Sequence, residues 1–326
     1  MALRIDQQFL AGTIVAAMLS AGCAGSPGSG SGSGSPTPAP SATEPPLRVA
    51  AIPYEDPQKE SEQYVGFGNY LGQKVNGQDA KVAIASDYVG VVISLENKQA
   101  DVAYLSPYSY ALAADRAVAA GHPLVLLAMP YVIPSGQTRG SLTYEGVIFT
   151  RADSGIRTLK DLKGKTFAFN EQTSASGYLY PAMLLLAAGV NPQPESRGGD
   201  LKQVFFAGAQ GVVPSVFNRQ SDAGAIFEEG IRLSLSNPAD RAQIKVIQRT
   251  DPIPNGMLVA RGDLAPDEIK KLRDAIVSIN TAPEGKAALA KMHVEKWAPA
   301  NDSMFDKVRQ TARKLGLTLE TSSMKS

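Results

Sequence analysis

Short apolar runs alternate with segments of helical periodicity from about residue 47 to residue 140. Each run is five to eight residues long and is bounded by polar or small residues, as expected of a buried strand. The runs are 47–53, 81–85, 100–106 and 123–130. Between the first two, apolar side chains recur every three or four positions, at Tyr64, Phe67, Leu71 and Val75. This alternation of strand and helix predicts a mostly parallel sheet that is covered by helices.

The starts of the next two helices carry local signals. Ser86 follows the second strand and is expected to be the N-cap of a helix, because a serine hydroxyl can accept a backbone N–H group there. Pro107 follows the third strand and is expected at the first helical position, where its missing N–H group costs no hydrogen bond. Both helices therefore begin just beyond the carboxyl end of a strand.

The same alternation starts again after residue 140, and the chain ends in helices. Six further strands are expected at 144–151, 165–170, 203–208, 222–228, 245–250 and 256–262. Three helical patterns follow them, at 265–280, 283–292 and 301–316. No internal repeat of fixed period accompanies this second series of elements, so the pattern indicates a second α/β unit rather than a repeat protein.

We therefore expect an α/β fold with two lobes. The first lobe would comprise residues 47–140 and 251–326, and the second would comprise residues 141–250. Two strands, near 140–150 and 243–260, would cross between the lobes as a hinge. Open α/β sheets bind ligands beyond the carboxyl ends of their strands, so two facing lobes predict a ligand cleft between them.

The N-terminal segment has the layout of a secretory signal. Arg4 precedes an apolar stretch at 9–19, which is shorter than the roughly 20 residues of a membrane-spanning helix. The small residues before Cys23 resemble the lipobox of bacterial lipoproteins. We expect a signal peptide at 1–22 and lipid attachment at Cys23, with a cleaved soluble protein or a retained membrane anchor as alternatives.

Residues 23–46 are rich in glycine, serine and proline, a composition of flexible and extended chain that cannot bury a core. They are expected to be the linker between the lipid and the two lobes. The protein would then work close to a membrane but outside the cytoplasm, at the periplasmic or outer face of the cell membrane.

Composition and charge exclude several classes of function. The chain has 32 Lys and Arg against 31 Asp and Glu, so no basic surface for nucleic acid is expected. The only histidines are His122 and His293, and neither has a metal-ligand spacing to other residues. The body after Cys23 holds no thiol, and glycine-rich nucleotide motifs and the G-x-S-x-G motif are absent. The residues therefore argue against an enzyme and against a metal site.

One loop carries more hydroxyl groups than a helix start needs. Residues 170–181 read NEQTSASGYLYP and join a predicted strand to a predicted helix. Thr173, Ser174 and Ser176 offer hydroxyls, Gly177 would let a ligand approach the backbone, and the helix start supplies N–H groups and a partial positive charge. These groups could bind an anion without a Lys or Arg. The alternative is a serine-capped helix with spare polar residues.

Three other positions lie at the ends of predicted strands. Tyr54 and Tyr108 follow the first and third strands on the expected cleft side, although a tyrosine there is more often a half-buried core residue. Glu228 ends the strand at 222–228 and would point toward the cleft. Its carboxylate would favour a ligand with an amine or with a protonated oxygen. Its neighbour Glu229 is more simply a solvated charge.

Three stretches resemble one family in their order and spacing. They are SDYVGVVISLENKQADVAYLSPYSYALA, YEGVIFTRADSGIRTLKDLKGKTFAF and SASGYLYP. Together they are similar to the phosphonate, phosphite and phosphate substrate-binding proteins of bacterial ABC transporters. The resemblance implies a type 2 periplasmic-binding-protein fold that closes on a small oxyanion and delivers it to an ABC permease with its ATPase. It implies no cofactor and no enzymatic step, and the binding protein is expected to be a monomer.

The family's site maps onto this chain with two departures. A Ser-Thr-Ser-Gly helix start holds the oxyanion in the family, and here it falls on 174–177 with Ala175 in place of the threonine. Thr173 would compensate for the lost hydroxyl. Gln210 stands where the family often has a histidine. The family's aromatic positions match Tyr54 and Tyr108.

Two alternatives stay open from the sequence. The same fold could bind another small anion, such as a sulfonate or an organic anion. A sensor or an enzyme could also be built on this fold, although neither a signalling domain nor a general base is evident.

Overall fold

The computed structural model describes residues 44–54 and 56–317, and all structural statements below concern these residues. The predicted signal peptide at 1–22, the lipid-attachment residue Cys23 and most of the linker at 23–46 lie outside them.

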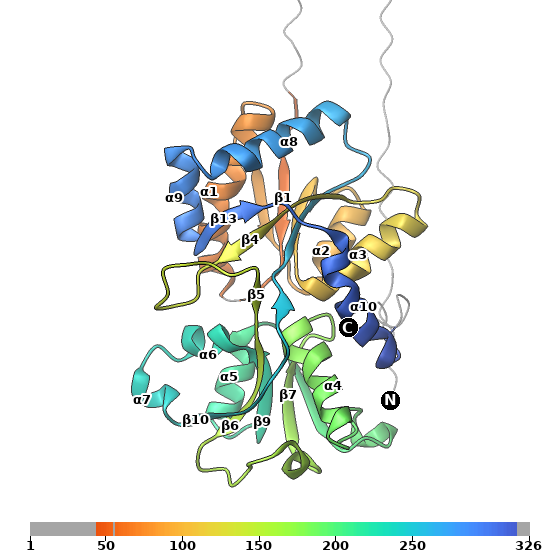
Figure 1. Ribbon diagram of the computed structural model, residues 1–326, viewed down its shortest axis with the longest axis vertical. Coiled ribbons are helices and arrows are strands. Elements are labelled where there is room, and N and C mark those ends of the chain that lie inside the picture. The colour runs from red at the N-terminus through yellow and green to blue at the C-terminus, as the bar shows by residue number, and fades with distance from the viewer. Residues whose placement is uncertain (1–43, 55, 318–326) are drawn as a thin grey trace, which may run out of the picture. The chain divides into compact units, whose positions relative to one another are not determined.

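The first lobe is built on a six-stranded mixed sheet (Figure 1). In spatial order its strands are β13 (Val294–Ala298), β4 (Val125–Val132), β12 (Met257–Ala260), β3 (Val102–Leu105), β1 (Arg48–Ala51) and β2 (Lys81–Ile84). Strands β1, β2 and β3 are parallel, as the sequence predicts. Strand β12 pairs antiparallel with both β3 and β4, because the chain returns from the second lobe and enters the sheet between them. The sheet therefore contains fewer parallel strand pairs than the alternation of strands and helices in the sequence predicts.

Helices cover both faces of this sheet (Figure 1). Helices α1 (Pro57–Val75), α8 (Pro266–Ile279) and α9 (Pro283–Lys291) enclose one apolar core with it. Helices α2 (Tyr88–Glu96), α3 (Pro107–Ala119) and α10 (Asp306–Lys314), with the short helix η4 (Asp302–Phe305), enclose the other. The four apolar residues predicted for the first helix all lie buried on α1.

The two predicted helix starts have different outcomes. Pro107 is the first residue of α3, and the Ser106 side chain caps it by accepting the Ser109 N–H group. The predicted cap at Ser86 is wrong, because Asp87 is the N-cap of α2 and accepts the Gly90 N–H group. Aspartate and serine are equally good caps, so the local sequence does not distinguish adjacent candidates.

The second lobe has a five-stranded mixed sheet. Its strands, in spatial order, are β10 (Ile244–Arg249), β6 (Gly146–Arg151), β9 (Ala223–Phe227), β7 (Thr166–Asn170) and β8 (Lys202–Phe206). The helices are η1 (Leu159–Leu162), η2 (Ala175–Leu179), α4 (Tyr180–Ala187), η3 (Glu195–Arg197), α5 (Ala209–Phe217), α6 (Glu228–Ser234) and α7 (Pro238–Arg241). Two apolar clusters, one on each face, form the core of this lobe.

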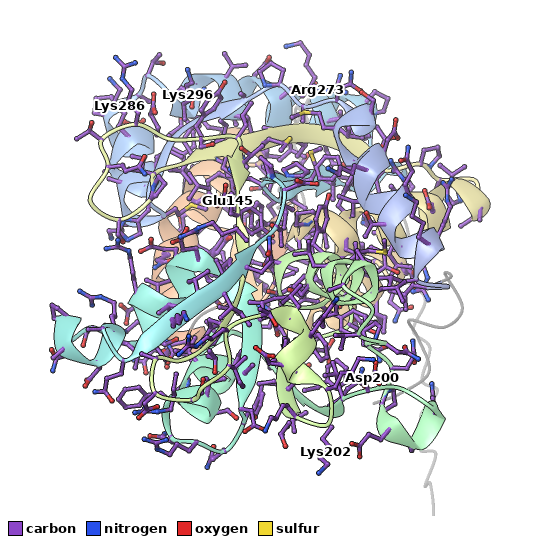
Figure 2. The ribbon with its side chains drawn as sticks, turned by 60° about the horizontal axis from the view of Figure 1, so that its bottom comes forward. Glu145, Asp200, Lys202, Arg273, Lys286 and Lys296 are labelled. Carbon is purple, nitrogen blue, oxygen red and sulfur yellow. The ribbon has the colours of Figure 1, made fainter. Side chains whose placement is uncertain are left out.

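Two segments run side by side between the sheets. Strand β5 (Thr143–Tyr144) pairs antiparallel with β11 (Ile253–Pro254), so that Tyr144 lies opposite Ile253. The hinge predicted near 140–150 and 243–260 falls on this pair. Glu145, which follows β5, lies where the two lobes meet, as Figure 2 shows.

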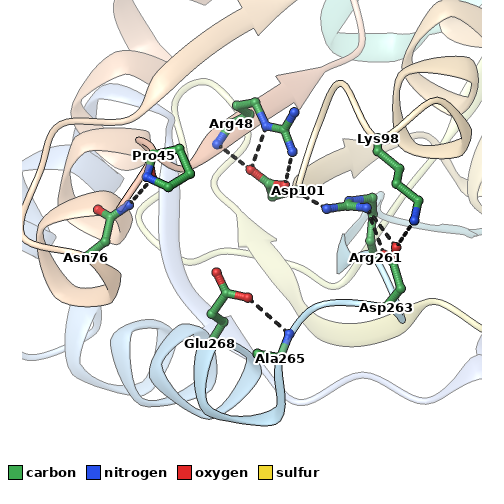
Figure 3. A network of polar contacts seen from close by, with 9 residues as sticks. All are labelled: Pro45, Arg48, Asn76, Lys98, Asp101, Arg261, Asp263, Ala265 and Glu268. Carbon is green, nitrogen blue, oxygen red and sulfur yellow. Dashed lines mark hydrogen bonds and ion pairs between the residues drawn. The ribbon is translucent and has the colours of Figure 1, made fainter. Parts of the chain in front are cut away.

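A buried ion cluster joins three strand ends of the first lobe (Figure 3). Asp101 accepts hydrogen bonds from Arg48 Nη2 at 2.5 Å and from Arg261 Nη2 at 3.0 Å, and Arg261 also binds Asp263. Burial alone would raise the pKa of Asp101, but the hydrogen bonds from the two arginines outweigh burial and lower it. Its contribution to stability is therefore present at neutral pH and is lost as the pH falls through that lowered pKa.

Replacing Asp101 with asparagine is expected to lower the free energy of unfolding by about 1–3 kcal/mol, because the largely buried Arg261 and the partly exposed Arg48 both lose their charged partner. Denaturant titration at neutral pH measures this loss. The matched control is Asp274→Asn, which breaks an exposed pair with Lys270 on α8 and should cost about 0.5 kcal/mol or less. Equal effects of the two substitutions would contradict a structural role for the Asp101 cluster.

Candidate functional site

The segment singled out in the sequence, residues 170–181, runs from the last residue of β7 through a short turn and η2 into the start of α4. Ser174 is the N-cap, since its Oγ accepts the Gly177 N–H group at 3.1 Å. Its carbonyl oxygen accepts the N–H groups of Tyr178 and Leu179 at 3.2 and 3.0 Å. The serine cap is therefore confirmed. A capped helix still presents the remaining N–H groups of its first turn to whatever lies beyond its end.

The three hydroxyls of this loop have different surroundings. Thr173, Ser174 and Ser176 are only 2–3% exposed. Ser174 Oγ caps the helix, and Ser176 Oγ accepts a long hydrogen bond of 3.4 Å from the Tyr144 hydroxyl. Thr173 Oγ1 is buried and has no hydrogen-bond partner among the described residues. A buried hydroxyl without a partner costs free energy, so Thr173 is the clearest vacant donor of the loop.

Further hydroxyls lie close to Ser176. Tyr180 comes one helical turn after Ser176, and its hydroxyl is also buried with no partner among the described residues. Burial raises the pKa of Tyr180 to about 12, and the nearby Asp251 adds to this shift. Burial also raises the pKa values of Tyr144 and Tyr104. All three phenols therefore stay protonated at neutral pH and can donate hydrogen bonds.

Asn170, the last residue of β7, joins two helix starts of the second lobe. Its Oδ1 accepts the N–H groups of Glu171 at 2.8 Å and Gly208 at 3.1 Å, and its Nδ2 lies 3.5 Å from Ser174 Oγ. Gly208 has φ 68° and is the N-cap residue of α5. One buried amide therefore holds the start of η2 and the start of α5 in a defined relation.

Tyr54 lies at a contact between the lobes. Its carbonyl oxygen accepts the Ala209 N–H group at 3.3 Å, and its ring packs edge-on against Phe227, with 6.3 Å between centroids. Its hydroxyl donates to Gln63 Oε1 at 3.2 Å. The prediction placed Tyr54 at the cleft, and the structure brings it to the first residue of α5.

Tyr108 and Gln210 differ in exposure. Tyr108 is 5% exposed and belongs to the apolar cluster between the first sheet and α2 and α3. Its hydroxyl acts electrostatically on Tyr178 of the second lobe. Gln210 is exposed in the first turn of α5. The ligand-binding roles of both residues stay predictions.

Glu228 has a partner that the sequence analysis does not include. Arg249 at the end of β10 binds both of its carboxylate oxygens, one of them at 2.7 Å from Nη2, and Arg249 Nη1 lies 3.4 Å from Glu145. The side chains of Glu228 and Arg249 are each 46% exposed. The carboxylate that was predicted to point toward the cleft is therefore paired with an arginine in a half-exposed ion pair.

Glu229 differs from its prediction as a solvated charge. Its side chain is 27% exposed, and its Oε1 is buried without a partner, although Arg232 lies 3.9 Å away from Oε2. It is inside the first turn of α6, which packs on α5 and holds it against the lobe. Solvation was the wrong expectation because α6 begins at once after β9, with no loop between them.

Sequence reasoning missed Tyr180, Asn170 and Glu171. Tyr180 could have been found from its spacing of four from Ser176, which places both on one helix face. The role of Asn170 depends on strand order, since β7 and β8 must be neighbours before its amide can reach Gly208. Glu171 contacts the other lobe, and no local pattern reveals such a contact.

Other kinds of site receive no support from the described residues. Residues 44–54 and 56–317 contain no group of three or more His, Cys, Asp or Glu side chains that could hold a metal ion. In the same part of the chain no helix has the length and apolar character to cross a bilayer. A cavity of about 410 Å³ lies along β2 and α2, and none of the predicted site residues lines it.

Comparison with known proteins gives one consistent result. Residues 49–305 match the family described as "ABC transporter, phosphonate, periplasmic substrate-binding protein". The chain is 27% identical over 277 residues to the phosphonates-binding periplasmic protein of Escherichia coli, a match that covers 82% of this chain and 76% of that protein. It is 27% identical over 232 residues to the phosphate-import protein PhnD of Mycolicibacterium smegmatis, covering 70% of each.

A solved structure shows the same fold. It is a binding protein component of an ABC phosphonate transporter from Pseudomonas aeruginosa, with a TM-score of 0.70 and 25% identity. The match covers 86% of this chain and 89% of that one. The α/β fold with two mixed sheets is therefore that of these binding proteins, as the sequence predicts.

Proposed function

Because this chain belongs to the family of periplasmic substrate-binding proteins of phosphonate ABC transporters, we propose that it captures a small phosphorus oxyanion at the start of η2. The ligand is a phosphonate, phosphite or phosphate, and closure of the two lobes retains it for delivery to a permease with its ATPase. The family consists of transport components that bind a substrate, and no catalytic step is involved.

The buried hydroxyl of Thr173 is the main support for this proposal. Thr173 is 2% exposed and its hydroxyl has no partner among the described residues, yet it stands one residue before the N-cap of a helix. An anion at this helix start would accept a hydrogen bond from Thr173 and from first-turn N–H groups, and would meet the positive end of the helix dipole. Thr173 would thus replace the hydroxyl that Ala175 lacks.

Protonated phenols complete the site in this proposal. Among the residues that the structure describes, the Tyr180 hydroxyl has no hydrogen-bond partner and the Tyr144 hydroxyl has the long contact to Ser176. Both can turn toward an oxyanion that lies at the start of η2. No arginine or lysine is required, because neutral donors aimed at one point stabilise a charge that is shielded from water.

Contacts between the lobes support capture by closure. Ser106 Oγ of the first lobe donates to the Thr173 carbonyl oxygen at 3.2 Å, and Ala209 of the second lobe donates to Tyr54. Ala175, Leu179 and Tyr180 pack in an apolar cluster with residues of the first lobe. The loop that would hold the ligand is therefore also the loop on which the lobes meet, so that ligand binding and closure are coupled.

A thermal-shift panel tests the ligand class. A ligand that binds only the folded protein raises its melting temperature, and the shift grows with concentration above Kd. Methylphosphonate, phosphite and phosphate are expected to raise the melting temperature, whereas methanesulfonate at equal concentration is not. A shift with the sulfonate alone would favour the alternative ligand class on the same fold.

The proposal extends to the membrane. Cys23 is the proposed site of lipid attachment after removal of residues 1–22, and the linker at 23–46 keeps the monomeric lobes near the permease. Cys23→Ala is expected to move the protein from the detergent phase to the aqueous phase, or to leave it uncleaved, without changing ligand affinity. A wild-type protein that partitions into the aqueous phase would contradict the lipid anchor.

A further inference from the structure

A half-buried glutamate of the second lobe caps a helix of the first. Glu171 follows β7, and its Oε2 accepts the N–H group of Tyr88 at 2.7 Å. Tyr88 is the first residue of α2, where the N–H groups have no partner inside the helix. Asp87 already caps this helix from within the same lobe through Gly90. Helix α2 therefore has two carboxylate caps, and one of them comes from across the lobe boundary.

The same carboxylate belongs to the loop that would hold the ligand. The Glu171 carbonyl oxygen accepts the Ser174 N–H group at 2.8 Å, which forms the turn leading into η2. Its own N–H group donates to Asn170 Oδ1. Burial raises the pKa of the Tyr88 hydroxyl, and the nearby Asn170 side chain opposes that rise. Glu171 therefore joins Tyr88 of α2 to the turn that contains Thr173, and a change in this contact is expected to move that turn.

We propose that Glu171 is a positioning residue for the ligand, and that its carboxylate, by capping α2 only when the lobes are closed, couples closure to the uptake of a proton. This inference rests on the proposed capture of an oxyanion at the start of η2, and it adds to that function a dependence on pH.

The surroundings of Glu171 favour the protonated form of its carboxyl group. Burial raises the pKa of its carboxyl group to about 7, and the nearby Asp87 adds to the rise, while the Tyr88 N–H group opposes it. Its Oε1 is buried with no partner among the described residues. The other titratable groups that act at this contact are Tyr88 itself and, through it, Glu60 and Tyr144. None of them is a cation that would stabilise the ionised carboxylate.

The pKa of Glu171 differs between the closed and the separated lobes. When the lobes separate, water reaches Glu171 and its pKa falls toward the ordinary value near 4.5. Closure therefore takes up a proton at pH values between that ordinary value and about 7. The contribution of this proton to the free energy of closure is complete below the ordinary pKa of Glu171. It declines as the pH rises and is lost above about pH 7.

Calorimetric titration of methylphosphonate at pH 6 and pH 8 tests the coupling. The ionisation of the ligand itself is common to every variant, so the comparison is made with Glu171→Gln, which keeps the shape and one acceptor oxygen but cannot titrate. Between pH 6 and pH 8 the wild type is expected to lose about threefold to tenfold more affinity than Glu171→Gln. Buffers of different ionisation enthalpy should show the wild type taking up more protons on binding at pH 6 than the variant does.

Two further variants complete the test. Glu171→Ala removes the cap and is expected to weaken binding at least about fivefold at both pH values. Glu195→Gln, an exposed change on η3 of the same lobe, should behave as the wild type. Thermal unfolding without ligand verifies that each variant is folded, and Glu171→Gln supplies the answer if the alanine variant is not.

Two results would overturn the inference: equal pH dependence in the wild type and Glu171→Gln, or wild-type affinity in a folded Glu171→Ala. Both outcomes are distinct from a failure of the proposed function, in which no phosphorus oxyanion binds to the wild type at all.

Discussion

Gly177→Ala is expected to abolish high-affinity ligand binding, with a loss of about 100-fold or more. A Cβ atom at Gly177 would lie 2.3 Å from the Asn170 Cβ atom and 3.1 Å from Ser174 Oγ, because Gly177 is buried in the first turn of η2 against the end of β7. The helix start must therefore shift away from the strand. Two charge-assisted hydrogen bonds that lose their geometry correspond to about 3 kcal/mol, which is about 100-fold in affinity.

The same substitution should lower the free energy of unfolding by about 1–3 kcal/mol, the usual cost of forcing a methyl group into a packed interior. Gly66→Ala is the matched control, because a Cβ there would meet only Ala288 at 3.8 Å in the middle of α1. Alanine in a helix interior is worth about 0.5–1 kcal/mol over glycine, so the control should be more stable and should bind normally. A Gly177→Ala variant that keeps full affinity would mean that the ligand does not depend on this helix start.

Thr173→Val is expected to change binding and stability in opposite directions. Valine has nearly the shape of threonine without the hydroxyl, and Thr173 Oγ1 has no hydrogen-bond partner within residues 44–54 and 56–317. Ligand affinity should fall by about 10-fold to 100-fold, since a charged oxygen loses a donor. The ligand-free protein should be equally stable or more stable by about 1 kcal/mol, because an unpaired buried hydroxyl is removed.

A second buried threonine of the same lobe gives the reverse pattern. Thr150 is fully buried on β6, and its hydroxyl donates to the Asp222 carbonyl oxygen at 2.6 Å. Thr150→Val should lower the free energy of unfolding by about 1–3 kcal/mol and leave ligand affinity unchanged. Calorimetry and denaturant titration on both variants measure the four values. If Thr173→Val reduced stability but not affinity, Thr173 would be an ordinary structural residue.

Local patterns in the sequence predicted most elements of the fold. Buried strands, the apolar face of α1 and the proline at the start of α3 depend on neighbouring residues and were predicted correctly. The insertion of β12 between β3 and β4 was not predicted, because it depends on where the returning chain finds an open position. Ser86 and Asp87 illustrate a smaller limit, since either side chain can cap α2 and the packing of the first turn decides between them.

The candidate site, like the fold, was predicted only in part from the sequence. The surplus of hydroxyls at 173–176 was visible in the sequence, whereas their separate surroundings were not: Ser174 caps, Ser176 meets Tyr144, and Thr173 is left without a partner. These differences arise from the other elements that pack around η2. A sequence motif can therefore predict a cluster of hydroxyls but not which of their hydrogen bonds are already used.

Glu228 shows how a distant partner changes an expectation. A carboxylate facing the cleft alone would repel a dianion and attract an aminoalkylphosphonate. Arg249, 21 residues further along the chain, binds both of its oxygens, and this half-exposed ion pair offsets part of that charge. The selection of ligands by Glu228 stays a prediction, and its expected strength is smaller than the sequence alone suggests.

A crystal structure of the protein with methylphosphonate tests the central claim most directly. The account predicts phosphonate oxygens within about 3 Å of Thr173 Oγ1 and of first-turn N–H groups of η2, with the Tyr180 hydroxyl also in hydrogen-bonding contact. A phosphonate held elsewhere, for example in the cavity of about 410 Å³ along β2, with Thr173 still unpaired, would contradict it.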